Sequence, residues 1–70
     1  MELKKLKAQI EAILFAMGKS VRLTAIAEAV ELDEDTVRKV IHTMMDEYED
    51  EVHGINIIEL EDSFQMCTKA

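Results

Sequence analysis

The sequence predicts a small α+β domain: a winged helix-turn-helix, in which three helices are followed by a β-hairpin wing. Apolar residues recur at helical spacing in three successive segments before residue 50. The period then changes to strand-like alternation in "INIIEL" and "FQMCT", which the turn signal "EDS" separates. A tight link joins the second and third helices, and this order of elements makes a winged helix. The whole chain, 1–70, is expected to form this one domain.

The first helix is expected over Glu2–Met17. One face carries its apolar stripe: Leu3, Leu6, Ile10, Ile13, Leu14 and Met17. Gly18 follows where a left-handed residue ends a helix. Phe15 lies off this stripe, on the opposite side beside Ala8 and Ala12. Either the helix is buried on two sides within the domain, or the face with Phe15 meets a partner chain.

The second helix is expected over Leu23–Val30, where apolar residues fall at i, i+3, i+4 and i+7. Before it, Lys19–Arg22 is a short link with room for one extended residue at Val21. Arg22 then occupies the N-cap, a position that favours Ser or Asp. The alternative is a later start with Thr24 as the cap.

The third helix has a clearer beginning. Asp33 is a good N-cap, and Glu34 and Asp35 favour the positive end of the helix dipole. One face carries the apolar residues Val37, Val40, Ile41, Met44 and Tyr48. The helix is expected to fray near Asp50 or Glu51.

The outer face of this third helix would read DNA in a helix-turn-helix protein, and it carries Arg38 and Lys39 near its start. Glu34 and Asp35 lie one turn earlier, and we expect each acid to pair with the base that follows it at i+4. The wing tip, Glu61–Asp62, is acidic too. With fifteen acids, eight bases and a net charge of −7, the chain lacks the basic patch that phosphate binding requires. Direct nucleic-acid binding by this domain is therefore not expected.

The hairpin is expected to turn around Glu61–Ser63. Five residues are candidates for one face or the other: Ile55, Ile57, Phe64, Met66 and Thr68. The adjacent pair Ile57–Ile58 breaks the alternation, so the register is open and a β-bulge is one way to accommodate it.

No pattern of residues predicts catalysis, a cofactor or a metal. The two glycines are isolated, so no phosphate-binding loop is formed. His42, His53 and Cys67 fall on three different elements, and no short-spaced pair anchors a metal site. We expect a protein that is not an enzyme and that holds no cofactor or metal.

The composition also bears on the compartment. A single cysteine forms no internal disulfide, which fits a reducing environment. The charged start of the chain is unlike a signal peptide, and no apolar run approaches the ~20 residues of a membrane span. We expect a cytoplasmic protein that does not bind membranes.

Five blocks of sequence, taken in order, resemble one known family. The blocks are Ile10–Gly18, Leu23–Ile41, Glu47–Glu51, Gly54–Leu60 and Phe64–Lys69. Together they are similar to the N-terminal part of segregation and condensation protein B, the winged-helix accessory subunit of prokaryotic condensin. The sequence departs from the family's pattern at Met17, Ser20, Arg22, Ser63 and Cys67. These departures affect turns rather than the apolar stripes.

The resemblance implies a non-enzymatic scaffold for chromosome segregation and condensation, associated with the nucleoid through its complex. Members of the family form homodimers, with this domain central to dimerisation. They also bind the kleisin subunit that bridges the heads of the condensin ATPase. Family members carry a second winged helix, which is absent here, so we expect the N-terminal domain of a longer protein.

We expect the dimer interface to combine the first helix with the hairpin. The predicted contact residues are Leu14, Phe15, Ile58 and Phe64. This prediction starts from Phe15, which lies off the main apolar stripe. The alternative function is a DNA-binding transcriptional regulator with the same fold. A third possibility, an enzyme fragment, has no catalytic constellation to support it.

Overall fold

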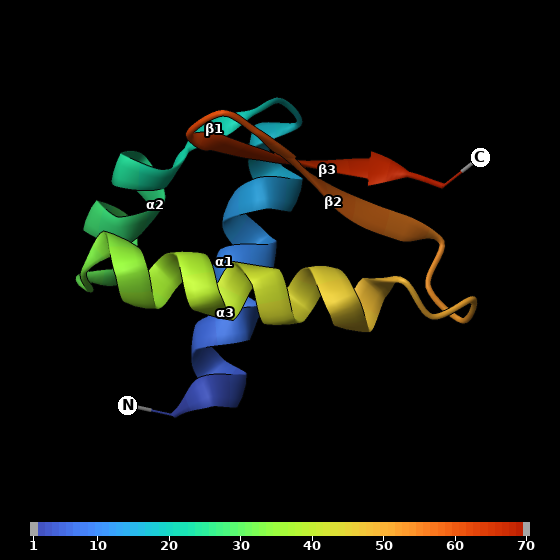
Figure 1. Cartoon of the computed structure of the whole chain (residues 1–70), viewed down its shortest axis with the longest axis horizontal. Coiled ribbons are helices and arrows are strands. Elements are labelled where there is room, and N and C mark those ends of the chain that lie inside the picture. The colour runs from blue at the N-terminus through green and yellow to red at the C-terminus, as the bar shows by residue number, and fades with distance from the viewer. Residues whose placement is uncertain (1, 70) are drawn as a thin grey trace.

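The computed structural model describes residues 2–69, and its elements confirm the predicted α+β winged helix (Figure 1). In chain order they are α1 (Leu3–Met17), β1 (Val21–Arg22), α2 (Leu23–Val30), α3 (Glu34–Tyr48), β2 (Ile55–Leu60) and β3 (Ser63–Thr68). In Figure 1, α1 crosses behind α3, and the sheet lies along one side of the helices.

The sheet has three antiparallel strands in the order β1-β3-β2. The predicted hairpin is therefore extended by the short strand β1, which pairs Val21 with Phe64. The pairing of β2 with β3 is continuous from Ile55↔Thr68 to Leu60↔Ser63, so there is no bulge at Ile57–Ile58. A two-residue turn joins the strands.

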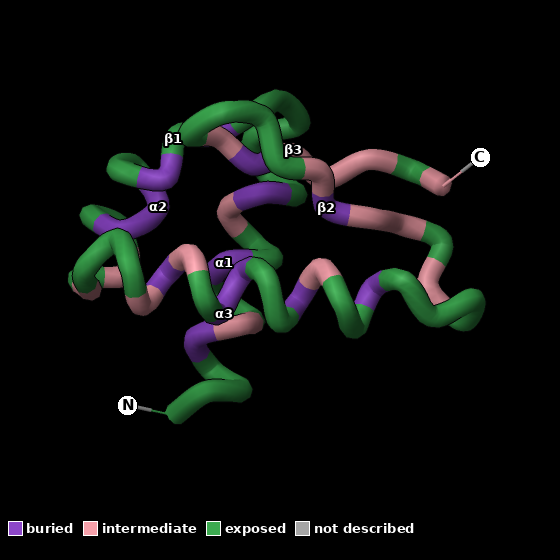
Figure 2. Tube along the Cα trace, in the orientation of Figure 1, coloured by how far each residue is buried: buried purple, intermediate pink, exposed green. Residues whose placement is uncertain are grey.

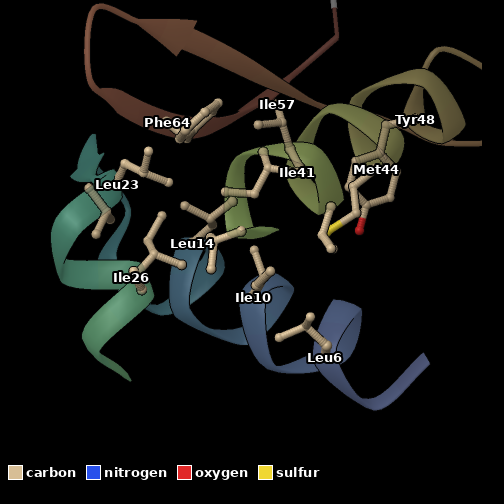
Figure 3. Packing of buried hydrophobic residues seen from close by; sticks show 14 residues of the cluster. Leu6, Ile10, Leu14, Leu23, Ile26, Ile41, Met44, Tyr48, Ile57 and Phe64 are labelled. Carbon is tan, nitrogen blue, oxygen red and sulfur yellow. The ribbon is translucent and has the colours of Figure 1, made fainter. Parts of the chain in front are cut away.

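The core lies between the helices and the sheet, and its buried positions run along every helix (Figure 2). Six residues in it are 0% exposed: Ile10, Leu14, Ile26, Val37, Ile41 and Phe64. Figure 3 shows α1 residues pointing at α3, with Phe64 closing the core from the sheet. The two ends of the predicted α1 stripe, Leu3 and Met17, are exposed because the helix extends past the core at both ends.

Local sequence explains the end of α1 and the start of α3. Gly18 adopts a left-handed conformation (φ 63°), and its N–H donates to the Leu14 carbonyl at 3.4 Å. Asp33 caps α3: its carboxylate accepts hydrogen bonds from the Thr36 hydroxyl at 2.7 Å and the Thr36 N–H at 2.9 Å. Those two bonds hold the pKa of Asp33 below its ordinary value.

The start of α2 depends on the wing instead of a side-chain cap. Arg22 occupies the N-cap without a side-chain hydrogen bond, so the helix begins at Leu23 and Thr24 is not the cap. The Leu23 N–H donates to the Asp62 carbonyl in the hairpin turn, at 2.7 Å. A backbone group of the wing thus satisfies a donor that the helix itself leaves free.

Candidate functional site

The register of the hairpin divides its residues between two faces. Directly opposed residues of antiparallel strands share a face, so Ile57 and Met66 lie on the same side of the sheet. Phe64 is two residues before Met66 in β3 and therefore lies on that side as well. This face points to the helices, because Ile57 and Phe64 are both in the core. Ile58 pairs with Gln65, so both lie on the outer face of the sheet.

The four residues expected at the dimer interface do not share one surface. Leu14 and Phe64 are both 0% exposed, so they pack beneath the surface and have no accessible area for contact with a partner. Leu14 belongs to the core stripe of α1, and the register turns Phe64 toward the helices. Phe15 is 76% exposed, whereas Ile58 is half-buried on the outer face of the sheet. The interface itself stays a prediction, with Phe15 and Ile58 as its accessible members.

Phe15 borders a hollow of ≈ 200 Å³ between the end of α1 and the far end of the hairpin. Its lining contains no charged side chain: Leu14, Phe15, Gly18, Ile55, Met66, Cys67 and Thr68. From the sequence alone, Ile55, Met66 and Thr68 fit either face of the hairpin, because the register is open. In the structure only Glu61 and Asp62 form the turn, which is shorter than the expected Glu61–Ser63, and the turn length sets the register of the hairpin.

A cluster of charged side chains ties the wing to α3. Arg38 Nη1 donates to Glu59 Oε2 at 2.9 Å, and His42 Nε2 lies 2.9 Å from Glu59 Oε1. Arg38 Nη2 also lies 3.6 Å from Asp62 Oδ1 in the hairpin turn. The His42 ring packs edge-on against Phe64, with ring centroids 6.2 Å apart. These contacts occupy the part of α3 that would approach base edges in a DNA-reading protein.

The expected pairing within α3 is wrong. Arg38 pairs with the wing instead of Glu34, and none of the ion pairs between residues 2–69 joins Asp35 to Lys39. Arg38 turns to the wing because β2 packs on α3 and brings the Glu59 carboxylate within direct reach. The Arg38 and Glu59 side chains are 34% and 29% exposed, so their charge-assisted contact is less solvated than a pair on the open face of a helix.

A second set of polar contacts holds α1 to α3. The Tyr48 hydroxyl donates to Glu11 Oε2 at 2.6 Å, and Lys7 Nζ donates to Glu47 Oε2 at 2.7 Å. Burial and then the hydrogen bond to Glu11 raise the pKa of Tyr48 above its ordinary range. These contacts are structural, because they close the seam between two helices.

Two features of residues 2–69 bear on other functions. Among residues 2–69, no group of three or more His, Cys, Asp or Glu side chains is arranged to hold a metal ion. None of the helices in the same range is both long and apolar enough to cross a membrane.

A family model described as "Segregation and condensation complex subunit ScpB" matches residues 8–70. The chain belongs to this family. Segregation and condensation protein B of Lachnoclostridium phytofermentans is 63% identical over 70 residues, which cover 100% of this chain and 37% of that protein. The same protein of Agathobacter rectalis is 50% identical over 64 residues, with coverages of 90% and 34%. The chain thus spans little more than a third of the length of these relatives.

Solved structures of the family have the same fold. A crystal structure of a dimer of the ScpB N-terminal domain, complexed with an ScpA peptide, superposes with a TM-score of 0.91 at 37% identity. It covers 96% of this chain and 84% of that one. ScpB from Mycobacterium tuberculosis gives a TM-score of 0.90 at 27% identity, covering 100% of this chain and 44% of that one. The match places this chain's fold in the winged-helix domain of the family.

Proposed function

We propose that this chain is a non-enzymatic scaffold of the chromosome segregation and condensation complex, and that its domain joins two copies and supports kleisin binding. It acts in the cytoplasm and reaches the nucleoid through that complex. Membership of the family supports the role. A dimer with a bound ScpA peptide in the related N-terminal domain supports both partners.

The exposure of Phe15 is the observation that carries dimerisation. Its ring is 76% exposed at the rim of an uncharged hollow, and Met17, 49% exposed, lies in the same last turn of α1. Single exposed apolar residues are common, but a large aromatic beside an apolar hollow is the arrangement that contact with a partner buries. Burying a phenylalanine side chain stabilises a complex by about 1.5–3 kcal/mol.

Phe15→Asp tests this role. We expect the variant to fold and to sediment as a monomer at concentrations where the wild type is a dimer, since a carboxylate in an apolar contact is costly. Val52→Asp is the matched control: Val52 is 79% exposed, lies outside the hollow, and receives the same added charge. It should dimerise like the wild type. Equal dimerisation of folded Phe15→Asp and wild type would remove Phe15 from the interface.

Kleisin binding is tested separately. A fluorescent peptide from the kleisin of the same complex should change its anisotropy on titration with the wild-type domain. The measurement is repeated with the Phe15→Asp monomer, which asks whether the peptide needs the dimer. Absence of binding to the dimeric wild type would contradict the kleisin role of this domain and leave self-association standing.

A DNA-binding regulator is the alternative function, and the geometry of the wing disfavours it. The guanidinium of Arg38 is held by Glu59 and faces Asp62 as well. Phosphate contacts supply much of the affinity of DNA-binding proteins, and an acidic wing tip repels them.

A further inference from the structure

β3 is flanked by strands on both edges along only part of its length. β2 pairs with it from Ser63 to Thr68, whereas β1 reaches only Ser63 and Phe64. Beyond Phe64, the edge that faces away from β2 has no strand beside it within residues 2–69. Proteins usually protect such an edge with charges, proline or a covering segment, but Gln65–Thr68 contains neither a charge nor a proline. This edge is open to pairing.

Two hydrogen bonds identify the backbone groups on the open edge. Successive residues of a strand direct their N–H and C=O groups to alternate edges. On the β1 side, the Asp62 carbonyl accepts a hydrogen bond from the Leu23 N–H at 2.7 Å. On the β2 side, the Lys69 N–H donates to the carbonyl of Gly54, the residue before β2, at 3.0 Å. Even-numbered residues of β3 therefore face the β1 side. Met66 and Thr68 direct their N–H and C=O groups to the open edge.

The hollow beside this edge is suited to a second copy of the chain. Three other hollows of the described chain are each bordered by charged side chains, whereas the hollow with Phe15 has none. Two copies with a net charge of −7 repel each other least where neither presents charge. A strand edge is also complementary to itself across a two-fold axis.

We propose, resting on the dimerisation proposed above, that β3 pairs antiparallel with β3 of a second copy across a two-fold axis. One register uses all the open groups: Met66 lies opposite the partner's Thr68, and Thr68 opposite the partner's Met66. Cys67 then faces the partner's Cys67 on the axis, with Cα atoms about 4.5 Å apart. In this register the partner's Phe64, which pairs with its β1, lies opposite position 70, two residues past the end of β3. The added strand covers the hollow and Phe15.

Amide hydrogen exchange, followed residue by residue by NMR, tests the pairing in the unmodified protein. The N–H groups of Met66 and Thr68 should exchange slowly in the dimer and fast on dilution to monomer. Those of Gln65 and Cys67, which face β2, should be protected in both and serve as internal controls. A dimer in which Met66 and Thr68 still exchange fast overturns the pairing and leaves dimerisation intact. A strict monomer overturns both.

Thr68→Pro removes one donor from the open edge without affecting the pairing with β2. We expect a rise in the dimer dissociation constant of about tenfold or more, because a symmetric dimer loses that hydrogen bond twice. Thr68→Val keeps the N–H and should change the constant little. Equal constants for both variants overturn the proposal. If Thr68→Pro does not fold by circular dichroism, the exchange experiment still decides.

The single cysteine reports the register. Diamide takes up the two electrons and two protons released when two thiols join, and the predicted spacing falls within the ~4.4–6.8 Å of disulfide Cα pairs. We expect a covalent dimer from the wild type and none from Cys67→Ser. The double variant Cys67→Ser, Asn56→Cys moves the thiol from β3 to β2, one strand away from the two-fold axis of the dimer. It should therefore not form a cross-link. Cross-linking through position 56 instead of 67 overturns this register.

Another polypeptide could occupy the same edge, and the exchange experiment distinguishes it. Protein is diluted until it is monomeric, and a kleisin peptide is then added. Protection of Met66 and Thr68 only under those conditions assigns the edge to the peptide and overturns pairing with a second copy.

Discussion

Two aromatic residues, on α3 and α1, differ in their contact with water. Tyr48 is 9% exposed, donates its hydroxyl proton to Glu11 at 2.6 Å, and packs edge-on against His53 with ring centroids 5.1 Å apart. Phe15 has no polar group, and 76% of it is exposed. Tyr48 therefore stabilises the fold of one chain, whereas Phe15 is available to a second.

At the residue scale, Tyr48→Phe should lower the free energy of unfolding by about 1 kcal/mol, because it removes one hydrogen bond and keeps the ring. The loss stays modest since Glu11 is exposed and can bind water instead. Urea unfolding at neutral pH measures the change. Dimerisation, measured alongside, should be unaffected, because Tyr48 lies in the seam between α1 and α3.

The same variant gives a pH test with a defined sign. Burial and then the hydrogen bond to Glu11 raise the pKa of Tyr48 in the folded chain, whereas the unfolded chain titrates near 10. Above that pH the unfolded chain loses its proton first, so stability falls as pH rises toward the folded pKa. The stability difference between wild type and Tyr48→Phe should therefore shrink above about pH 10. A constant difference would contradict the raised pKa.

At the scale of elements, features that depend on neighbouring residues could be predicted from the sequence, whereas contacts between distant segments could not. Asp33 caps α3 and Gly18 ends α1 as expected, because each acts on its own neighbouring turn. β1 was not predicted as a strand, since two residues have no measurable period and gain their pairing from Phe64. The partner of Arg38 was missed for the same reason: Glu59 comes near it only after the wing packs on α3.

The wing contact can be measured with a double-mutant cycle on Arg38→Gln and Glu59→Gln. We expect a coupling energy of about 0.5–1 kcal/mol that weakens at high salt, because both side chains remain partly exposed. Urea unfolding at two salt concentrations gives this energy. Glu61→Gln is the control, since Glu61 lies in the adjoining hairpin turn but is absent from the ion pairs of residues 2–69. Zero coupling at low salt would contradict a role for the pair in holding the wing.

At the scale of the whole molecule, the apolar pattern was enough to predict the architecture but not the interaction surface. Helical periodicity alone showed that Phe15 lies outside the apolar stripe of α1 and is therefore a candidate for contact with a partner. Assigning Leu14 and Phe64 to the same surface required knowing which face of the hairpin meets the helices. That depends on register, which a two-residue turn sets and the run Ile57–Ile58 obscured.

The overall charge leads to the last prediction: the isolated domain should not shift duplex DNA in a gel at low salt. Fifteen acids oppose eight bases, and the wing acids Glu59 and Asp62 engage Arg38, the base best placed to contact DNA. A variant with both wing acids replaced by amides frees Arg38 and should still bind weakly, because one guanidinium neutralises too few phosphates. Tight, steeply salt-dependent binding that Arg38→Ala abolishes would instead assign the domain to the DNA-binding regulators.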